Sequence, residues 1–379
     1  MIIKKTYKFC LLLVDEYLQL CCQFAGACRW VFNHSLAARK EAWDNDKKSL
    51  SLFDQNKYLT TLKKQEATGW LQDIHSQVLQ QALHDLDQAY KHFFRRIKRK
   101  EGKAGHPRFK CKGEHDSFRY PQGVKVVDNQ VYLPCIGWVK FCKTREIQGQ
   151  ICQTTVIKKA KRWFVCFSCE QEVPDLVVKN PKKVAGIDVG IERFATIATE
   201  DDIEIIQNPK FLRKDLDHLR FLSRQLSKKH LKGKNWKKAK AKVQEFHEKI
   251  KNRRTDFLHK LSTQLVKSHD MLVVESLEIQ KMIINASKAL ARSLSEVGWG
   301  MFLEMLKYKC EYLGKKFLKT ARFFASSQIC SSCGSKATMK LDCRRYSCGC
   351  GLEVHRDDNA AINIRAAGIS ALKACGAAL

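Results

Sequence analysis

Two pairs of cysteines near the C-terminus constrain the fold of this chain more than any other feature. Cys330 and Cys333 lie in a Cys-x-x-Cys-Gly turn, and 14 residues separate Cys333 from Cys348, which forms a Cys-Gly-Cys-Gly turn with Cys350. Paired thiolates at glycine turns are typical of a tetrahedral zinc ribbon, so the spacing predicts one structural Zn²⁺. The tight second pair leaves Cys343 as an alternative to Cys348, and buried cysteines without metal as the competing interpretation.

Composition limits the class of protein. The 379 residues suggest two or three domains, and 44% hydrophobic residues with 6 prolines exclude a disordered chain. A net charge of +30 indicates a polyanionic partner, with nucleic acid first. The 17 cysteines favour reduced cytosolic thiols over a disulfide framework. The apolar run 9–14 is too short for a signal peptide, and no stretch could span a membrane, so we expect a cytoplasmic protein with no membrane partner.

The first half of the chain changes its hydrophobic period near residue 105. Residues 16–100 are helical in pattern, with Leu79, Leu83 and Leu86 on one face, and end in a basic run. The run fits either a solvated helix end or a phosphate contact, and the net charge favours the phosphate contact. Short strands follow at 124–127, 131–133, 138–142, 151–157 and 163–169, which predict a small β-barrel or sandwich. The candidate contacts in the basic run are Arg95, Arg96, Lys98 and Arg99.

The second half combines short apolar strands with basic helices. Strands are predicted at 184–190, 194–198, 203–206 and 271–275, and helices over 211–266 and 301–313. Residues 210–260 hold 18 Lys and Arg against 5 Asp and Glu, a charge that predicts contact with a phosphate backbone. The alternative is a surface segment that only aids solubility. The candidate contacts are Lys228, Lys229, Lys232, Lys234, Lys237 and Lys238.

Three acidic residues interrupt or end apolar elements. Asp188 lies within an apolar strand, Glu275 ends another, and Asp357 opens an Ala-rich helix. Singly, each fits a turn, a strand end or a helix cap, and Asp358 is the adjacent alternative for the third. Together they match two-metal phosphodiester hydrolysis, in which carboxylates from separate elements hold two Mg²⁺ ions roughly 4 Å apart. An RNase H-like fold would deliver them in this way.

Four motifs occur in an order that closely resembles the TnpB family. These are transposon-encoded, RNA-guided DNA nucleases related to type V CRISPR effectors. The motifs are Gly186–Ile191, Val273–Leu277, Ser326–Gly334 and Arg356–Ile364. The segments Gly105–Lys110, Leu133–Gly137 and Arg254–Lys260 are also similar to family landmarks, so the resemblance covers nearly the whole chain.

The resemblance implies a mixed α/β, multidomain nuclease with a RuvC acidic triad at Asp188, Glu275 and Asp357. The implied division is a wedge domain beginning at 1–14, a helical recognition lobe at 15–104, a wedge β-barrel at 105–180, a RuvC domain at 181–325, a zinc ribbon at 326–354 and a RuvC helix at 355–379. The implied partners are a guide RNA from the transposon end and double-stranded target DNA beside a short transposon-adjacent motif. Such a protein would be nucleoid-associated when bound to DNA.

Two departures and two competing functions remain. His355 stands where the family often has Asp, and could be a fifth candidate zinc ligand, and Ser276 stands where an acid is frequent. The first alternative function is a catalytically silent, guide-dependent repressor, which the presence of all three acids disfavours. The second is a DNA-cutting transposase, which the position of the ribbon and the long front half fit poorly.

Overall fold

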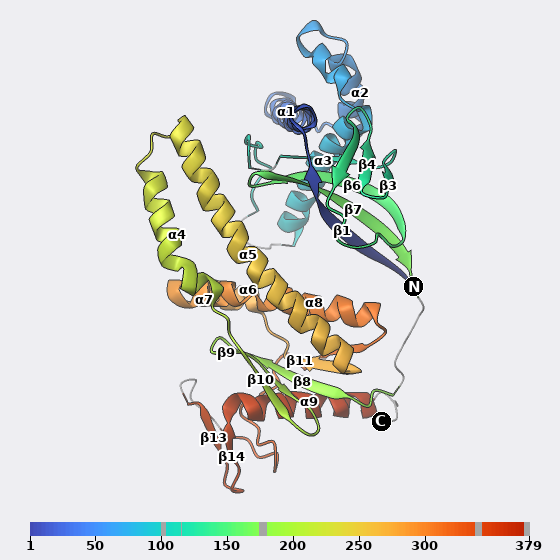
Figure 1. The fold of residues 1–379 in the computed structure, drawn as a ribbon. Coiled ribbons are helices and arrows are strands. Elements are labelled where there is room, and N and C mark those ends of the chain that lie inside the picture. Colours follow the sequence, from blue (N-terminus) through green and yellow to red (C-terminus); the bar gives the residue numbers. More distant parts are fainter. Residues whose placement is uncertain (100–103, 115, 174–179, 338–342, 375–379) are drawn as a thin grey trace. The chain divides into compact units, whose positions relative to one another are not determined.

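The structure is a computed structural model that describes residues 1–99, 104–114, 116–173, 180–337 and 343–374. The chain has a mixed α/β fold and divides into two compact units, Met1–Val173 and Pro174–Leu379 (Figure 1). In the described part of the chain, no helix is long and apolar enough to cross a membrane.

The first unit contains a seven-stranded antiparallel sheet in the order β2-β6-β7-β1-β5-β4-β3. Strand β1 pairs with β7 from Ile2 to Cys10, and its last residues, Leu11 and Leu12, pair with β5. It therefore joins two halves of the sheet. The strands are β1 (Ile2–Leu12), β2 (Ser117–Tyr120), β3 (Lys125–Val127), β4 (Gln130–Leu133), β5 (Gly137–Phe141), β6 (Gln150–Lys159) and β7 (Arg162–Glu172).

The barrel expected for this region does not close. Among the described residues, β2 and β3 are the two edges of the sheet and do not pair with each other. A closed barrel needs a continuous ladder around its circumference. The two edge strands have only four and three residues, too few for such a seam.

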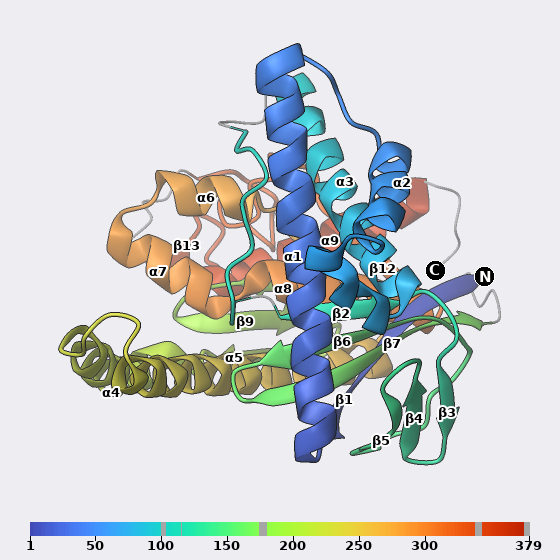
Figure 2. The same cartoon turned by 90° about the horizontal axis from the view of Figure 1, so that it is seen from above.

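Residues 16–100 are mainly helical, as their apolar spacing predicts. The helices are α1 (Asp15–Asp46), α2 (Leu52–Leu62) and α3 (Ser76–Lys98), with a 3-10 turn η1 at Glu66–Asp73. Two of them, α1 and α3, contact strand β2 of this sheet. Figure 2 shows α1 beside α3, with α2 at their side. Phe24 of α1 lies against Phe118 and Tyr120 of β2, with ring centroids 5.3 and 6.5 Å apart. The helices and sheet thus share one core.

The second unit is built on a five-stranded sheet in the order β10-β9-β8-β11-β12. Strands β8, β9 and β10 form an antiparallel meander, and β11 is parallel to both β8 and β12. The strands are β8 (Val184–Val189), β9 (Arg193–Ala198), β10 (Ile203–Gln207), β11 (Met271–Val274) and β12 (Lys316–Lys319). The first four lie where the hydrophobic pattern predicts them.

Helices cover both faces of this sheet. One face packs on α5, α7 and α8, and the opposite face packs on α9 (Figure 1). A two-stranded sheet of β13 and β14 precedes α9. The elements are α4 (Phe211–Ser227), α5 (Lys234–Ser268), α6 (Ile279–Asn285), α7 (Lys288–Val297), α8 (Trp299–Tyr312), β13 (Arg345–Ser347), β14 (Glu353–His355) and α9 (Arg356–Ala374).

Helix α9 approaches the sheet closely because glycines stand at two contacts. A Cβ atom added at Gly186 of β8 would lie 2.3 Å from the carbonyl oxygen of Ala361. A Cβ at Gly368 of α9 would lie 2.3 Å from Cγ2 of Val273 in β11. Both distances are shorter than a Cβ atom tolerates. Helix α9 can therefore lie this close to the sheet only with glycine at positions 186 and 368.

Candidate functional site

The alternation of side chains along the two central strands directs two of the three acids to one face. Ala185 and Ile187 of β8 belong to the core under α5 and α8, so Gly186 and Asp188 point to the face of α9. In the parallel pairing, Val274 of β11 is opposite Ile187. Continuing this register by one residue places Glu275 beside Asp188, on the same face.

The third acid reaches this place because α9 runs antiparallel to β8. The Arg365 guanidinium donates a hydrogen bond from Nε to the carbonyl of Val184 at 3.2 Å, and Ala361 lies over Gly186. Asp357 is one helical turn before Ala361, which brings it to the level of Asp188. A Cβ at Gly190 would lie 4.0 Å from Oδ2 of Asp357.

Burial and mutual repulsion perturb these carboxylates. Burial raises the pKa of Asp188 well above its ordinary value, and the charges of Glu275 and Asp357 raise it further, while Arg356 opposes the shift. Burial also raises the pKa of Glu275. Three carboxylates grouped in this way favour either protonation or a bound cation.

The structure distinguishes Asp357 from its neighbour Asp358. Asp358 is ion-paired with Arg193, with Nη1 and Oδ1 2.7 Å apart. Asp357 is buried, and its carboxylate lies 3.8 Å from Nδ1 of His355 and 3.8 Å from Nε of Arg356. Neighbouring helical residues point about 100° apart, so only Asp357 faces the other two acids.

The four predicted cysteines lie together. The Sγ atoms of Cys330 and Cys350 are 3.6 Å apart, as are those of Cys333 and Cys348, and all four lie within 4.8 Å of one another. Four sulfurs at about 2.3 Å from a tetrahedral Zn²⁺ would be roughly 3.8 Å apart, so the cluster fits this ion. Within the described residues it is the one group of three or more His, Cys, Asp or Glu side chains so arranged.

Neither alternative zinc ligand belongs to this cluster. Cys343 is exposed and contacts the carbonyl of Arg345 at 3.2 Å, and His355 accepts a hydrogen bond from the backbone N–H of Asp357 at 3.3 Å. Ser335 instead contacts the sulfurs of Cys333 and Cys348 at 3.0 and 3.1 Å. Hydrogen bonds from the Cys350 backbone and Ser335 lower the pKa of Cys348 to about 6, which favours the metal-binding thiolate.

Two asparagines that the sequence analysis missed connect the cysteine cluster to α9. Asn359 accepts a hydrogen bond from the N–H of Ser331 at 2.9 Å and donates one to the carbonyl of Ile329 at 2.7 Å. Asn363 donates to the same carbonyl at 2.6 Å and to that of Ser326 at 2.8 Å. Both side chains are buried. The signal available in the sequence was their spacing of one helical turn inside an Ala-rich helix. Two amides on the same face of such a helix indicate hydrogen-bond partners outside it, because buried amides are rarely left without partners.

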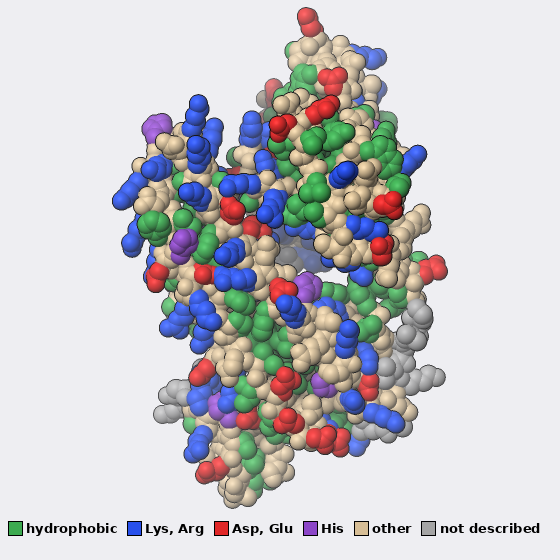
Figure 3. Space-filling model, viewed as in Figure 1, with side chains coloured by type: hydrophobic (Ala, Val, Ile, Leu, Met, Phe, Trp, Pro, Cys, Tyr) green, Lys and Arg blue, Asp and Glu red, His purple; other side chains and the backbone are tan. Residues whose placement is uncertain are grey.

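The predicted basic residues are at the surface. The lysines at 228, 229, 232, 234, 237 and 238 are all exposed, and Figure 3 shows Lys and Arg side chains gathered over α4 and α5. Arg95, Arg96, Lys98 and Arg99 are exposed at the end of α3 in the first unit. Lys100, the last residue of that predicted run, lies outside the described residues.

The comparisons with known proteins agree with the motif order. Residues 166–286 match a family described as a probable transposase, OrfB_IS605, and residues 299–364 match the Cas12f1-like TNB domain. A protein of Escherichia coli K12 named "Putative RNA-guided DNA endonuclease InsQ" is 35% identical, over 93% of this chain and 89% of its own length. The chain belongs to the TnpB family. A Streptomyces pristinaespiralis relative with the same activity in its name is 33% identical, over 99% of this chain and 91% of its own.

Solved structures support the fold of this TnpB-family protein. The Cas12f1 chain in a complex with sgRNA and target DNA matches with a TM-score of 0.60 at 14% identity, over 96% of this chain and 99% of that one. The mini-RNA-guided endonuclease CRISPR-Cas_phi3 matches with a TM-score of 0.50 at 10% identity, over 97% and 92% of the two chains. At these identities the likeness concerns the fold.

Proposed function

We propose that this protein is an RNA-guided, metal-dependent DNA endonuclease that binds a guide RNA from a transposon end and cuts DNA beside a short transposon-adjacent motif. The observation that carries the proposal is the meeting of Asp188, Glu275 and Asp357 at one edge of the sheet. Family membership and the names of the relatives support the same activity. The protein would act in the cytoplasm, at the nucleoid when bound to DNA.

The domain roles follow from the same proposal. The second unit would hold a RuvC nuclease of RNase H-like topology, since an antiparallel meander is followed by two parallel strands and a helix. Residues 326–354 would be its zinc-ribbon insert and 355–379 its last segment, which contains α9 (Arg356–Ala374); residues 338–342 and 375–379 lie outside the described residues. Residues 15–104 would be the recognition lobe, and 1–14 with 105–180 the wedge domain, which is supported by β1 pairing with β5 and β7. The first unit ends at Val173, and residues 174–179 of the proposed wedge domain lie outside the described residues.

The side chains of the site fit hard divalent cations. Carboxylate oxygens are the ligands that Mg²⁺ prefers, and Asp188, Glu275 and Asp357 supply them from three separate elements. Two Mg²⁺ ions held there would activate a water and stabilise the leaving oxygen of a phosphodiester. The chain itself holds Asp188 within β8 and Glu275 directly after β11, carries Asp357 on α9, and has Arg356 near enough to offset part of the negative charge.

The test measures cleavage of target DNA by the purified protein with its copurified RNA, sequenced beforehand to define the target. Asp188→Ala, Glu275→Ala and Asp357→Ala should each lower the cleavage rate by about 10²- to 10³-fold or more. Guided DNA binding should stay nearly unchanged, because affinity comes from basic contacts spread over the protein. Magnesium removal by a chelator should abolish cleavage in the unmodified protein.

Asp358→Ala is the matched control, since it removes an adjacent carboxylate that is paired with Arg193. Normal cleavage by Asp357→Ala with an inactive Asp358→Ala would reassign the third ligand. Guided binding without cleavage under any metal condition would favour the silent repressor. Cleavage that is equally efficient without RNA would favour a transposase.

We also propose that the exposed lysines of the α4–α5 segment track a phosphate backbone, with Arg95, Arg96, Lys98 and Arg99 making similar contacts from the first unit. Changing Lys228, Lys229, Lys237 and Lys238 to Gln should weaken binding to all target sequences alike. The salt dependence of binding should become shallower by roughly 0.7 to 0.9 for each lost contact. The same four positions changed to Arg keep the charge and serve as the control. An unchanged salt slope in the Gln variant would contradict the contact.

A further inference from the structure

A pocket of about 550 Å³ in the first unit is lined by aromatic and basic side chains. Trp43 of α1 and Phe94 of α3 line it, yet they are 54% and 60% exposed. Tyr90, which also lines the pocket, stacks on Phe94 with ring centroids 6.2 Å apart, and Phe93 packs on His106 at 4.2 Å. Large aromatic faces left open to solvent in a hollow indicate a binding site for a flat ligand.

Cations surround these aromatic faces. Lys40 and Lys48 line the pocket, and Lys40 lies over the exposed ring of Phe109, with Nζ 4.8 Å from its centroid. Lys47 lies over Trp43 in the same manner, at 5.9 Å. Positive charge around open aromatic rings suits a base with its phosphate, because rings stack on bases and ammonium groups attract phosphates.

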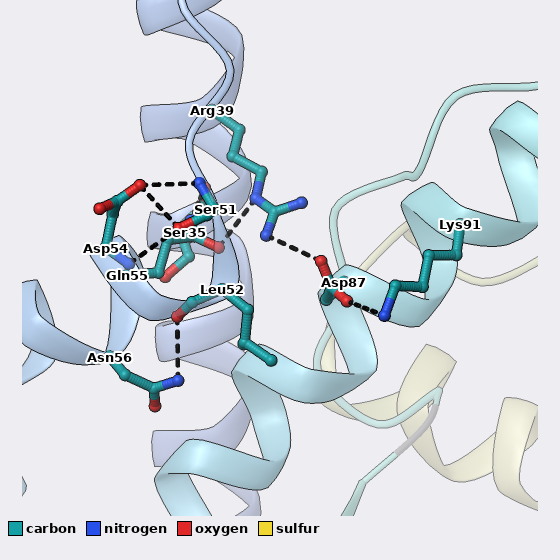
Figure 4. Close-up of polar contacts among 9 residues, drawn as sticks. All are labelled: Ser35, Arg39, Ser51, Leu52, Asp54, Gln55, Asn56, Asp87 and Lys91. Atoms are coloured by element: carbon teal, nitrogen blue, oxygen red, sulfur yellow. Dashed lines mark hydrogen bonds and ion pairs between the residues drawn. The ribbon is translucent and has the colours of Figure 1, made fainter.

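The position of Arg39, which also lines the pocket, is fixed by a polar network (Figure 4). Its Nε donates to Oε1 of Gln55 at 2.8 Å, and its Nη2 lies 3.4 Å from Oδ1 of Asp87. Gln55 is held in turn by the carbonyl of Ser35 at 2.9 Å. The guanidinium also lies 5.0 Å from the centroid of Tyr90. This wall of the pocket is therefore preorganised, which lowers the entropy cost of binding.

The lining also contains one acidic side chain, that of Asp44. Asp44 carries a charge that repels phosphate, but a carboxylate can accept a hydrogen bond from a ribose 2′-hydroxyl. The 2′-hydroxyl is the group by which a protein separates RNA from DNA. An apolar protein segment would not account for four basic side chains around the rings.

We propose that this pocket binds one unpaired nucleotide of an RNA strand. Its base stacks on the Trp43 and Phe94 rings, its phosphate meets Lys40 and Lys48, and its ribose hydroxyl meets Asp44. The inference rests on the proposed function, since the strand is the RNA that a guided nuclease would hold. It adds a recognition site for an unpaired base, which the pairing of guide and target does not require.

The test uses the full-length protein freed of copurified nucleic acid and a labelled single-stranded oligouridylate, with affinity measured by fluorescence anisotropy. Trp43→Ala should weaken RNA binding by roughly 5- to 150-fold, the range for one base stacked on an aromatic ring. Trp43→Phe should restore most of the affinity. The salt slope should stay unchanged in Trp43→Ala, because stacking releases no counterions, whereas Lys40→Gln should lower it.

Phe53→Ala is the matched control, because Phe53 is an exposed aromatic of α2 that does not line the pocket. Asp44→Ala should reduce the preference for oligouridylate over oligodeoxyuridylate. Equal affinity of the unmodified protein for the two probes would overturn the assignment to RNA. A loss in Phe53→Ala as large as in Trp43→Ala would overturn the pocket.

Unchanged RNA affinity in the Trp43→Ala, Phe94→Ala double variant would also overturn the proposal and leave an apolar protein segment as the occupant. The outcomes separate from those of the nuclease test. If the unmodified protein cuts DNA under guidance and Trp43→Ala binds RNA normally, the pocket proposal is wrong and the nuclease proposal stands. If the unmodified protein cuts no DNA but Trp43→Ala loses RNA affinity, the nuclease proposal is wrong and the pocket proposal stands.

Discussion

Replacing Asn359 by Ala tests how the cysteine cluster is fastened to α9. Asn359 has no exposed surface and makes two hydrogen bonds to the backbone on either side of Cys330. The Ile329 carbonyl keeps Asn363 as a donor after the change, so the group left without a partner is the N–H of Ser331. An unsatisfied group that is fully buried costs about 1–3 kcal/mol, and the N–H of the half-buried Ser331 should cost about 1 kcal/mol. At about 2–4 °C per kcal/mol for a unit of roughly 200 residues, Tm should fall by roughly 2–4 °C.

The double variant makes the expectation sharper. Asn363→Ala alone leaves Asn359 to serve the Ile329 carbonyl, but Asn359→Ala with Asn363→Ala leaves that carbonyl without any side-chain donor. The loss in unfolding free energy should therefore exceed the sum of the two single losses, by about 1 kcal/mol, because Ile329 is half-buried. Zinc should also leave the double variant faster when a chelator competes for it, because Ile329 and Ser331 flank the ligand Cys330.

The measurements are thermal unfolding, denaturant unfolding and zinc release followed with a colorimetric chelator. Asn252→Ala on the exposed side of α5 is the matched control, and it should change none of them. If the losses in unfolding free energy of the single variants add up to that of the double variant, and zinc is released at the unmodified rate, the two asparagines do not substitute for each other as donors to the Ile329 carbonyl.

Three further perturbations test the site and the packing. Because folding raises the pKa of Asp188, the metal-free protein should lose stability as pH rises from the unfolded-state pKa of this carboxyl to its folded-state pKa. Asp188→Asn removes the charge, so in chelator at neutral pH this variant should have a higher Tm than the unmodified protein. An equal Tm would refute this argument. Cys330→Ser should lower zinc content and Tm, whereas Cys343→Ser should preserve both, and zinc loss in the latter would reverse the ligand choice. Gly186→Ala should cost about 1–3 kcal/mol by overpacking against α9, while Gly69→Ala, with nothing within 4 Å of its new Cβ, should be nearly neutral; similar losses would argue against the close contact.

The sequence predicted what depends on local pattern. Short apolar runs located β8, β9 and β11, and an acid within or directly after such a run indicated a site at a strand end. The resemblance assigned Asp357 and left Asp358 as the alternative; the ion pair of Asp358 with Arg193 was beyond the sequence pattern, because the two residues are far apart in the chain. The open edges of the first sheet were also beyond the pattern, since closure depends on how the two edge strands meet and not on the period of either.

The cysteine cluster lies between β12 and α9 in the chain, and this position affects how Asp357 is held. Asp357 lies at the start of α9, which the chain enters from the cysteine-cluster segment through β14. Gly186 and Gly368 let the helix lie close to the sheet, but glycine contacts do not hold it at one position along its axis. Asn359 and Asn363 do so, because their four hydrogen bonds tie α9 to the backbone between Ser326 and Ser331. A bound zinc ion would make that backbone rigid, and the ribbon would thereby set the place of the third acid.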